Sequence, residues 1–343
     1  MTKILIVLTG GTIGSEIKDN TVNVTQNIYL EKILNSKFKQ INFKIIKPLN
    51  ILSENILPTD WNKVIKSIKK NWDDMFDGII ITYGTDTLSY AASAFSQFFY
   101  NFNKPVVMIS SDKPLKQKNA SGKYNIIAAI NFINKEKLQG TFVAYKNPNL
   151  CFVSFFLGSR VKQISSFNNK LNSILGDDFC KFKTNKFIYT KNNFNPSISN
   201  FRKKKFTKFK EKFFFTNKIL CIKTYPGINY KSFNLDKYKP KAILHSLYHS
   251  GTASTREQNN YSLINFIKKC KSKKIDFYIS PICKRKYIYQ SLKTLLKLNV
   301  KILDSMSFES SYAKLSLAYG SFSNKKEIEK FLNRNNFFEK NKF

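Results

Sequence analysis

Two short apolar runs in this chain end in turns rich in threonine and glycine, and this arrangement constrains the fold more than any other feature. Residues 4–8 run into the turn TGGTIG at 9–14, and residues 78–81 run into the turn YGTDT at 83–87. Continuous short apolar runs are typical of strands that are buried on both faces of a parallel sheet. In open α/β sheets, ligands bind at the carboxyl ends of such strands. We therefore expect the two turns to meet at one crevice.

Strand-like and helix-like patterns alternate along most of the chain, which indicates an α/β fold with two domains. A larger N-terminal domain with a mostly parallel sheet is predicted over residues 1–185, and a smaller C-terminal α/β domain over 217–343. The alternation stops at residues 186–216, around Pro196 and the basic run 201–205, so this segment is interpreted as an interdomain connection.

The individual elements follow from apolar spacing and from capping residues. Thr59 and Ser307 are expected to be helix N-caps. Strands are predicted at 4–8, 43–46, 78–81, 105–110, 141–145, 219–224, 242–247 and 277–280, and helices at 27–35, 58–72, 90–100, after 121–122, and at 262–271, 287–296 and 307–319.

The formal charge of +36 suggests a nucleic-acid surface, but the residue choice favours another interpretation. Only five of the 58 basic residues are arginine, and lysine is abundant together with asparagine, isoleucine, phenylalanine and tyrosine, all of which AT-rich codons encode. Proteins that read bases or clamp phosphates usually favour the arginine fork. A lysine-rich solvated surface is therefore preferred to a nucleic-acid partner, although nonspecific attraction to polyanions is expected.

Composition also bears on the cellular compartment of the protein and on the kinds of site that it can contain. No run approaches the roughly 20 apolar residues of a membrane span, and the N-terminus has no secretory pattern. The five cysteines are scattered without a CxxC pair, and only two histidines are present. A disulfide framework and a zinc site are both disfavoured, and a reducing cytoplasm is the simpler expectation.

The residues in the two turns suit attack on an amide, which needs a nucleophile, a proton acceptor and donors for the oxyanion. Thr12 follows Gly10 and Gly11, which let the backbone approach a ligand closely. Thr85 and Asp86 could relay a proton and bind an ammonium group. The structural alternatives are that the glycines only form a turn and that the second turn only caps a helix.

A wider set of segments, in order and over nearly the whole chain, resembles the L-asparaginases, most closely their cytoplasmic type I branch. The resemblance implies a two-domain asparaginase-like α/β fold, hydrolysis of L-asparagine to L-aspartate and ammonia, no cofactor and no metal, and a homo-oligomer, either dimer or tetramer. It is carried by TGGTIG at 9–14, SENILPTDW at 53–61, DGIIITYGTDTLSYAASA at 77–94, KPVV at 104–107, SGKYNIIAA at 121–129, GSRVKQISSF at 158–167, YPGI at 225–228, SLYHSGTAS at 246–254 and SFESSYAKL at 307–315.

The resemblance also implies roles for residues. Thr12 corresponds to the nucleophile, Thr85 to the second catalytic threonine and Asp86 to the residue that holds the α-ammonium of the substrate. Ser53 corresponds to a ligand of the α-carboxylate, followed by Glu54 in the same turn. Backbone N–H groups around Gly11, Gly84 and Thr85 are expected to line the substrate site.

Several positions depart from the family pattern. Tyr83 stands where histidine is common, and no tyrosine precedes Tyr29 in the region where the family has a lid tyrosine. The family lysine follows an arginine by three positions, which is Gln163 here, while Lys162 comes one place early. Because this segment is about two residues shorter than in the family, Lys162 is retained as the catalytic candidate. Glu54 replaces a neutral polar residue and would repel a substrate carboxylate if it pointed inward.

Two alternative functions therefore stay open beside an asparaginase. One is an ammonia-releasing subunit of a tRNA-dependent amidotransferase, and the other is a catalytically degenerate member that serves as a binding protein. Several residues outside the two turns receive structural interpretations. His249 and Ser250 are expected in a loop, Cys283 in the core, and Glu309 and Lys314 at a surface or interface.

Overall fold

The computed structural model describes the chain in two compact units, one centred on an eight-stranded sheet and the other on a four-stranded sheet. The first unit comprises Met1–Phe213 and Asn336–Phe338, and the second comprises Phe214–Asn335 and Glu339–Phe343. The described residues are 1–19, 21–24, 28–201, 209, 212–256, 260–282 and 286–340.

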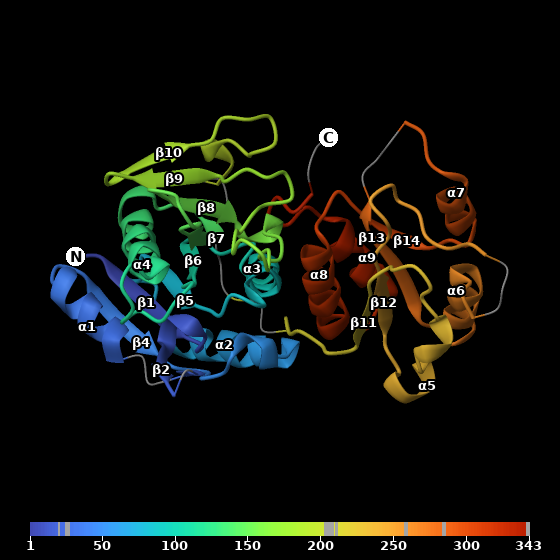
Figure 1. Cartoon of the computed structure of the whole chain (residues 1–343), viewed down its shortest axis with the longest axis horizontal. Helices are drawn as coiled ribbons and strands as arrows, with labels where there is room; N and C mark the ends of the chain where they lie inside the picture. Colours follow the sequence, from blue (N-terminus) through green and yellow to red (C-terminus); the bar gives the residue numbers. More distant parts are fainter. Residues whose placement is uncertain are drawn as a thin grey trace. The chain divides into compact units, whose positions relative to one another are not determined.

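The larger sheet contains the strands that carry both threonine turns (Figure 1). Its order is β10-β9-β8-β7-β6-β5-β1-β4, with β4, β1, β5, β6 and β7 parallel and β8, β9 and β10 antiparallel to their neighbours. The bounds are β1 Lys3–Leu8, β4 Asn42–Ile46, β5 Gly78–Thr82, β6 Pro105–Ile109, β7 Gly140–Tyr145, β8 Val153–Leu157, β9 Cys180–Lys183 and β10 Lys186–Tyr189. The predicted α/β class with a larger, mostly parallel sheet is confirmed.

Three strands of this sheet were not predicted from the sequence. β8 follows β7 after a short connection and pairs antiparallel with it, so the helix that a parallel crossover requires is absent between them. β10 falls in the segment interpreted as an interdomain connection, yet it pairs with β9 at the edge of the sheet. The basic run 202–205 lies outside the described residues.

Helices of the first unit cover the parallel strands. They are α1 Ile28–Lys37, α2 Pro58–Asn71, α3 Leu88–Phe98 and α4 Ser121–Asn131, and a two-stranded hairpin is formed by β2 Ser15–Lys18 and β3 Thr21–Val24. In Figure 1, strands β5 to β7 lie between α4 and α3. The expected N-cap Thr59 is wrong, because α2 starts at Pro58 with Leu57 as its cap, and Asp60 Oδ2 accepts a hydrogen bond from the Leu57 N–H.

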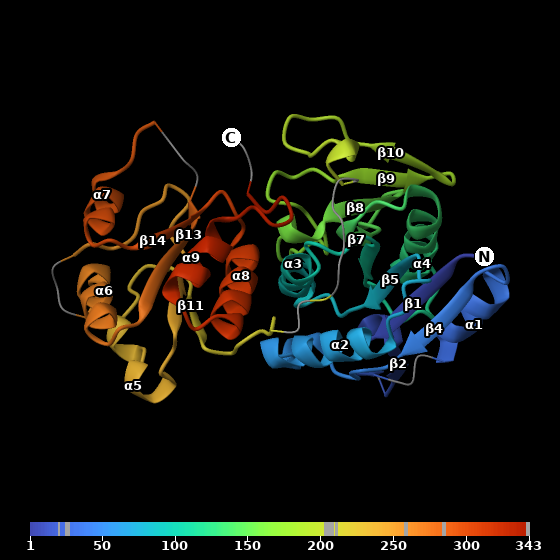
Figure 2. The same cartoon turned by 180° about the vertical axis from the view of Figure 1, so that it is seen from behind.

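The second unit is built on four parallel strands in the order β11-β12-β13-β14. The elements are β11 Ile219–Ile222, α5 Leu235–Tyr238, β12 Ala242–His245, α6 Leu263–Ser272, β13 Asp276–Ile282, α7 Gln290–Lys297, β14 Lys301–Asp304, α8 Phe308–Ser321 and α9 Lys325–Asn333. Figure 2 shows α8 and α9 on one side of these strands and α6 and α7 on the other. The predicted smaller α/β domain is confirmed, although β14, α5 and α9 were not predicted.

Two sequence expectations in this unit have opposite outcomes. Ser307 is the N-cap of α8 as predicted, since its side chain accepts a hydrogen bond from the Ser310 N–H. Lys314 is wrongly expected at a surface, because its side chain has no exposed area and its Nζ lies 2.5 Å from Glu339 Oε1, which is equally buried. Glu309 is also buried. Cys283 lies outside the described residues.

Within the described parts of the chain, we find no helix with the length and apolar character that crossing a bilayer requires.

Candidate active site

The first threonine turn is held open by two glycines at the carboxyl end of β1. Gly10 has φ +99° and Gly11 has φ +74°, values that favour glycine. Gly10 forms a bridge with Ile51, and Gly11 N–H donates to the Ile51 carbonyl at 3.3 Å. Thr12 then begins a short 3-10 turn and is half-buried. The glycines therefore place Thr12 at the tip of the strand rather than inside the core.

The second threonine turn leaves β5 next to the first. β1 and β5 are parallel neighbours, with Leu8 opposite Thr82. Thr85 is half-buried and Asp86 is exposed, and α3 begins two residues later. Because the chain leaves β1 toward β4 and leaves β5 toward β6, this is the point where the direction of the connections reverses, which is the usual ligand position in such sheets.

Backbone contact between two glycines shows that the turns converge. A Cβ added to Gly11 would lie 2.5 Å from Gly84 N and 2.6 Å from Gly84 Cα. Real Cβ atoms essentially never approach other atoms so closely, so a side chain at Gly11 would push the two turns apart. The expected meeting of the two turns at one sheet edge is thus observed, with Thr12 and Thr85 each one residue beyond the contact.

Ser53 joins these two turns as the third polar element. It is buried, its Oγ donates to Asp86 Oδ2 at 3.3 Å, and its carbonyl accepts from Thr87 Oγ1 at 2.9 Å. Thr87 is the residue before α3, but its hydroxyl makes no capping bond. The structural alternative in which Thr87 only caps the helix is therefore wrong, because this side chain connects the second turn to the third. Glu54 is exposed.

Tyr83, at the position where the family commonly has histidine, is fully buried and hydrogen-bonded. Its hydroxyl accepts from Trp61 Nε1 at 3.0 Å. Burial raises the pKa of Tyr83 to about 12, with side-chain hydrogen bonding to Trp61 and Thr87 opposing part of that effect. The phenol is therefore neutral at physiological pH, and its hydrogen bond with Trp61 fixes the start of the second turn to α2.

Gln163, rather than Lys162, contacts the second turn. Gln163 Nε2 donates to the Asp86 carbonyl, and Gln163 Oε1 accepts from Ser89 Oγ at 3.1 Å. The Lys162 side chain is exposed, and within the described ranges no carboxylate pairs with its ammonium group. Ser89 was not identified from the sequence. It could have been found because it lies three residues after Asp86 at the start of a helix, a spacing that keeps the two residues on the same face.

The hairpin β2–β3 follows Thr12 directly, in the region where the family has its lid. Ser15 Oγ donates to the Gly11 carbonyl at 2.9 Å, which ties the start of the hairpin to the turn. Glu16 pairs with Lys116 at 2.7 Å. Since this hairpin carries no tyrosine, any closure over Thr12 uses other side chains.

The remaining candidates of the sequence do not join this site. His249 and Ser250 lie in the turn between Tyr248 and Thr252, where Ser250 Oγ lies 3.0 Å from Thr252 Oγ1. His245 is buried in the second unit, with Nε2 at 3.0 Å from Tyr230 Oη. Across the described residues, no group of three or more His, Cys, Asp or Glu side chains could hold a metal ion.

Comparison with known proteins agrees with this geometry. The family model described as "Asparaginase, N-terminal" matches residues 3–178, which include both threonine turns and Ser53. Among solved structures, the thermostable L-asparaginase from Thermococcus kodakarensis is similar over 100% of both chains, with a TM-score of 0.80 and 23% identity. At this identity the likeness shows the fold.

Curated relatives that are similar in sequence include subunits of glutamyl-tRNA(Gln) amidotransferases. A glutamyl-tRNA(Gln) amidotransferase subunit from Methanosphaera stadtmanae is 27% identical over 346 residues, covering 96% of this chain and 75% of the relative. The subunit of the same name from Pyrococcus abyssi is 24% identical over 341 residues, with the same 96% and 75% coverage.

Proposed function

Because the chain belongs to the asparaginase family, we propose that it releases ammonia from the side-chain amide of a small amino acid at the edge where the two threonine turns meet. The observation that carries the proposal is the backbone contact of Gly11 with Gly84, because Thr12 and Thr85 are the residues that directly follow these two glycines. An asparaginase-type amidohydrolase needs a hydroxyl nucleophile and a nearby proton acceptor, and this edge offers both kinds of group.

In the proposed reaction, the Thr12 hydroxyl attacks the amide carbon and forms a tetrahedral intermediate, while Thr85 relays the Thr12 proton to the amide nitrogen so that this nitrogen can leave as ammonia. Backbone N–H groups of the glycine turns would stabilise its oxyanion, ammonia would leave, and water would hydrolyse the acyl-enzyme. Asp86 would hold the α-ammonium group, and Ser53, which already donates to Asp86, would contact the α-carboxylate. Glu54 would border the carboxylate position from the exposed side.

Proton transfer is the step for which this site is least well equipped, because an amide side chain stands where the family has a lysine. Gln163 contacts the second turn, and an amide cannot stabilise a developing charge as an ammonium group does. Loss of an acid–base group typically lowers rates by about 10²–10⁴-fold. We therefore propose a slow amidohydrolase, in which Gln163 positions the turn of Thr85 and Asp86 and Lys162 contributes little.

The amidotransferase role has more direct support from sequence than the free asparaginase role. The curated relatives that match 96% of the chain are named as subunits of a glutamyl-tRNA(Gln) amidotransferase, whereas the asparaginase likeness is one of fold. We propose glutamine as the ammonia source in that case, with a partner enzyme consuming the ammonia on glutamyl-tRNA. The formal charge of +36 suits a complex that contains tRNA.

Ammonia release by the purified full-length chain tests the common chemistry. L-asparagine and L-glutamine are supplied separately, and we expect release from one of them to fall about 10³-fold or more in Thr12→Val, which keeps the shape and lacks the hydroxyl. Thr12→Ser is the matched control and should retain activity. A folded protein that releases no ammonia from either substrate, alone or with tRNA and partner, supports the degenerate alternative and defeats the proposal.

Two further comparisons separate the finer hypotheses. A component of an amidotransferase should release ammonia from glutamine faster when glutamyl-tRNA and the partner enzyme are present, whereas a free asparaginase should be indifferent to them. Gln163→Ala should lower kcat about fivefold by freeing the Asp86 turn, since a lost hydrogen bond is worth about 1 kcal/mol. Lys162→Ala is the control, and a larger loss in that variant would contradict the assignment.

A further inference from the structure

A hollow in the second unit has no part in the proposed amide chemistry. It has a volume of about 200 Å³ and is lined by Tyr225, Pro226, Gly227, Ile228, Tyr248, Ser254, Arg256 and Tyr261. Tyr225 follows β11 and Tyr248 follows β12, two parallel strands paired from Ile219 opposite Ala242 to Ile222 opposite His245. The hollow therefore lies at the carboxyl ends of adjacent parallel strands, where α/β sheets bind ligands.

Hydrogen bonds fix the loops that form its walls. Thr224 N–H donates to Ser246 Oγ at 2.8 Å, and Thr224 Oγ1 donates to the Ser246 carbonyl, which joins the ends of β11 and β12. Tyr230 N–H donates to the Asn260 carbonyl at 2.8 Å, which connects the wall after β11 to the wall that carries Tyr261. The hollow is thus built by cross-linked turns, and a ligand would meet a largely preformed surface.

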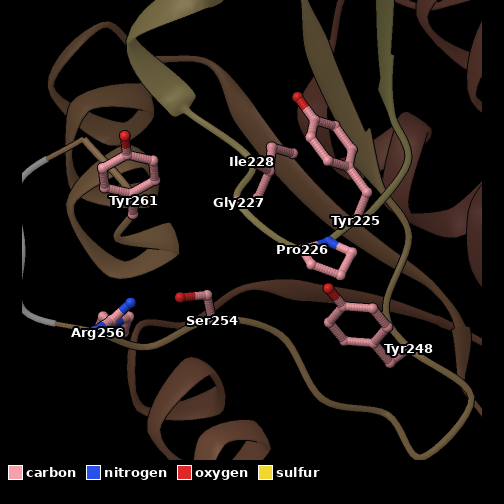
Figure 3. A pocket seen from close by; sticks show the side chains of 8 residues that line it. All are labelled: Tyr225, Pro226, Gly227, Ile228, Tyr248, Ser254, Arg256 and Tyr261. Atoms are coloured by element: carbon pink, nitrogen blue, oxygen red, sulfur yellow. The ribbon is translucent and has the colours of Figure 1, made fainter.

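Three aromatic rings that line this hollow are partly exposed. Tyr225 is 51% exposed, Tyr248 is 37% exposed and Tyr261 is 42% exposed. Figure 3 shows Tyr225 and Tyr248 on one side of the Pro226–Gly227 turn and Tyr261 on the other. Exposed tyrosines that gather around one concave site offer stacking surfaces for a flat ring system, because every nucleobase has a π-face that such rings accept.

Arg256 supplies the charge that a nucleotide requires. Its side chain is exposed, and no carboxylate of the described residues forms an ion pair with it. In Figure 3, Arg256 and Tyr261 lie on the same side of the hollow, and the Ser254 hydroxyl points toward Arg256. A guanidinium group next to a hydroxyl is suited to a phosphate, which it can contact through two N–H donors.

We propose that this hollow binds one nucleotide, with the base stacked on the tyrosines and the phosphate held by Arg256 and Ser254. Its volume of about 200 Å³ is below the roughly 300–1,000 Å³ of sites for drug-sized ligands, which suits one base with its phosphate better than a dinucleotide. The source is a free nucleoside monophosphate or the end of a single-stranded RNA. The inference does not depend on amide hydrolysis, since none of its residues belongs to the threonine turns.

Binding of two probes to the full-length chain tests the proposal. Fluorescence anisotropy follows a labelled single-stranded RNA of about eight nucleotides at about 150 mM salt, and calorimetry follows AMP. Tyr225→Ala and Tyr248→Ala should each weaken binding about 5- to 100-fold, whereas Tyr225→Phe and Tyr248→Phe should retain it, because the ring supplies the stacking. Arg256→Gln should weaken binding and reduce the salt dependence by close to one phosphate contact.

Matched controls come from the same unit. Tyr238→Ala removes a tyrosine that is 58% exposed on α5 but does not line the hollow, and Arg334→Gln removes an exposed arginine elsewhere; both should bind as the wild type does. Thermal unfolding confirms that each variant is folded. If AMP displaces the RNA, a free nucleotide is enough to fill the hollow. If RNA binds and AMP does not, the ligand is an RNA end. Either result, together with the expected effects of the variants, supports the proposed nucleotide site.

Three results would overturn the proposal. The first is that neither probe binds. The second is that RNA binding falls equally in the control variants, which would mean that the general positive charge attracts the RNA. The third is that the tyrosine changes convert a dimer to a monomer in sedimentation without altering RNA binding, which would make the hollow a contact between copies of the chain. Ammonia release is not read in this experiment, so its outcome is separate from that of the amidohydrolase proposal.

Discussion

A single methyl group added at Gly84 tests the contact between the second threonine turn and the turn of Ser53 most directly. In Gly84→Ala, the new Cβ would lie 2.4 Å from Ser53 Oγ and 2.5 Å from Ser53 Cβ, and the next neighbour, Gly11 Cα, would be 3.4 Å away. Gly84 does not have a positive φ, so the conflict comes from Ser53 and not from backbone strain. Overpacking of this kind costs about 1–3 kcal/mol of unfolding free energy.

The expected shift in melting temperature is about 2–12 °C, since each kcal/mol is worth about 2–4 °C in a unit of this size. Urea unfolding followed by tryptophan fluorescence reports the first unit, because both tryptophans of the chain, Trp61 and Trp72, lie in it. Ser53→Gly removes both atoms that meet the new methyl group. The double variant Gly84→Ala with Ser53→Gly should therefore recover most of the loss caused by Gly84→Ala.

Ser53→Ala is the control for this recovery. It removes Oγ but leaves Cβ, which would still lie 2.5 Å from the new methyl group, so it should rescue Gly84→Ala poorly. The coupling energy is obtained from the double-mutant cycle, which cancels the separate effects of each change at Ser53. Losses that add within about 0.5 kcal/mol for Ser53→Gly, or equal rescue by Ser53→Ala, would refute the contact between these turns.

Three other outcomes follow from buried groups. Burial lowers the pKa of His245 to about 4 from 6.5, so between these pH values the unfolded chain binds a proton at this histidine and the native state does not. The free energy of unfolding should therefore fall by about 3 kcal/mol as the pH drops through this range, and its pH dependence in urea unfolding should flatten in His245→Gln. Lys314→Met removes the ammonium group that pairs with the buried Glu339 carboxylate and should cost about 3–5 kcal/mol of unfolding free energy. Lys314→Met with Glu339→Leu should largely restore that loss, and an equally unstable double variant would argue against the pair. Tyr83→Phe removes the hydrogen bond that Trp61 Nε1 donates to the phenol and should cost about 1–3 kcal/mol in melting experiments while ammonia release stays near wild type; a large loss of activity in a folded variant would mean that the phenol takes part in the reaction.

Much of the fold could be predicted because its signals are local. The runs ending at Leu8 and Ile81 are apolar on both faces, and a glycine follows each of them. Gly10 has the positive φ that its turn requires, and Gly84 leaves room for the close approach of Ser53. The pairing of these two runs, and hence the meeting of the turns, was expected from the edge rule for parallel sheets. The antiparallel strands β8 to β10 were missed because short strands after short connections resemble loops in their pattern.

The sequence by itself determined where the parallel strands of the larger sheet and their two threonine turns lie, because apolar period and backbone freedom are properties of neighbouring residues. Only the tertiary structure decided that Gln163, one position from Lys162, contacts the Asp86 turn. It also decided that Lys314 is buried against Glu339 and that Tyr83 accepts from Trp61. These outcomes depend on side chains brought together from distant parts of the chain, and a shift of one residue in a loop changes which group arrives.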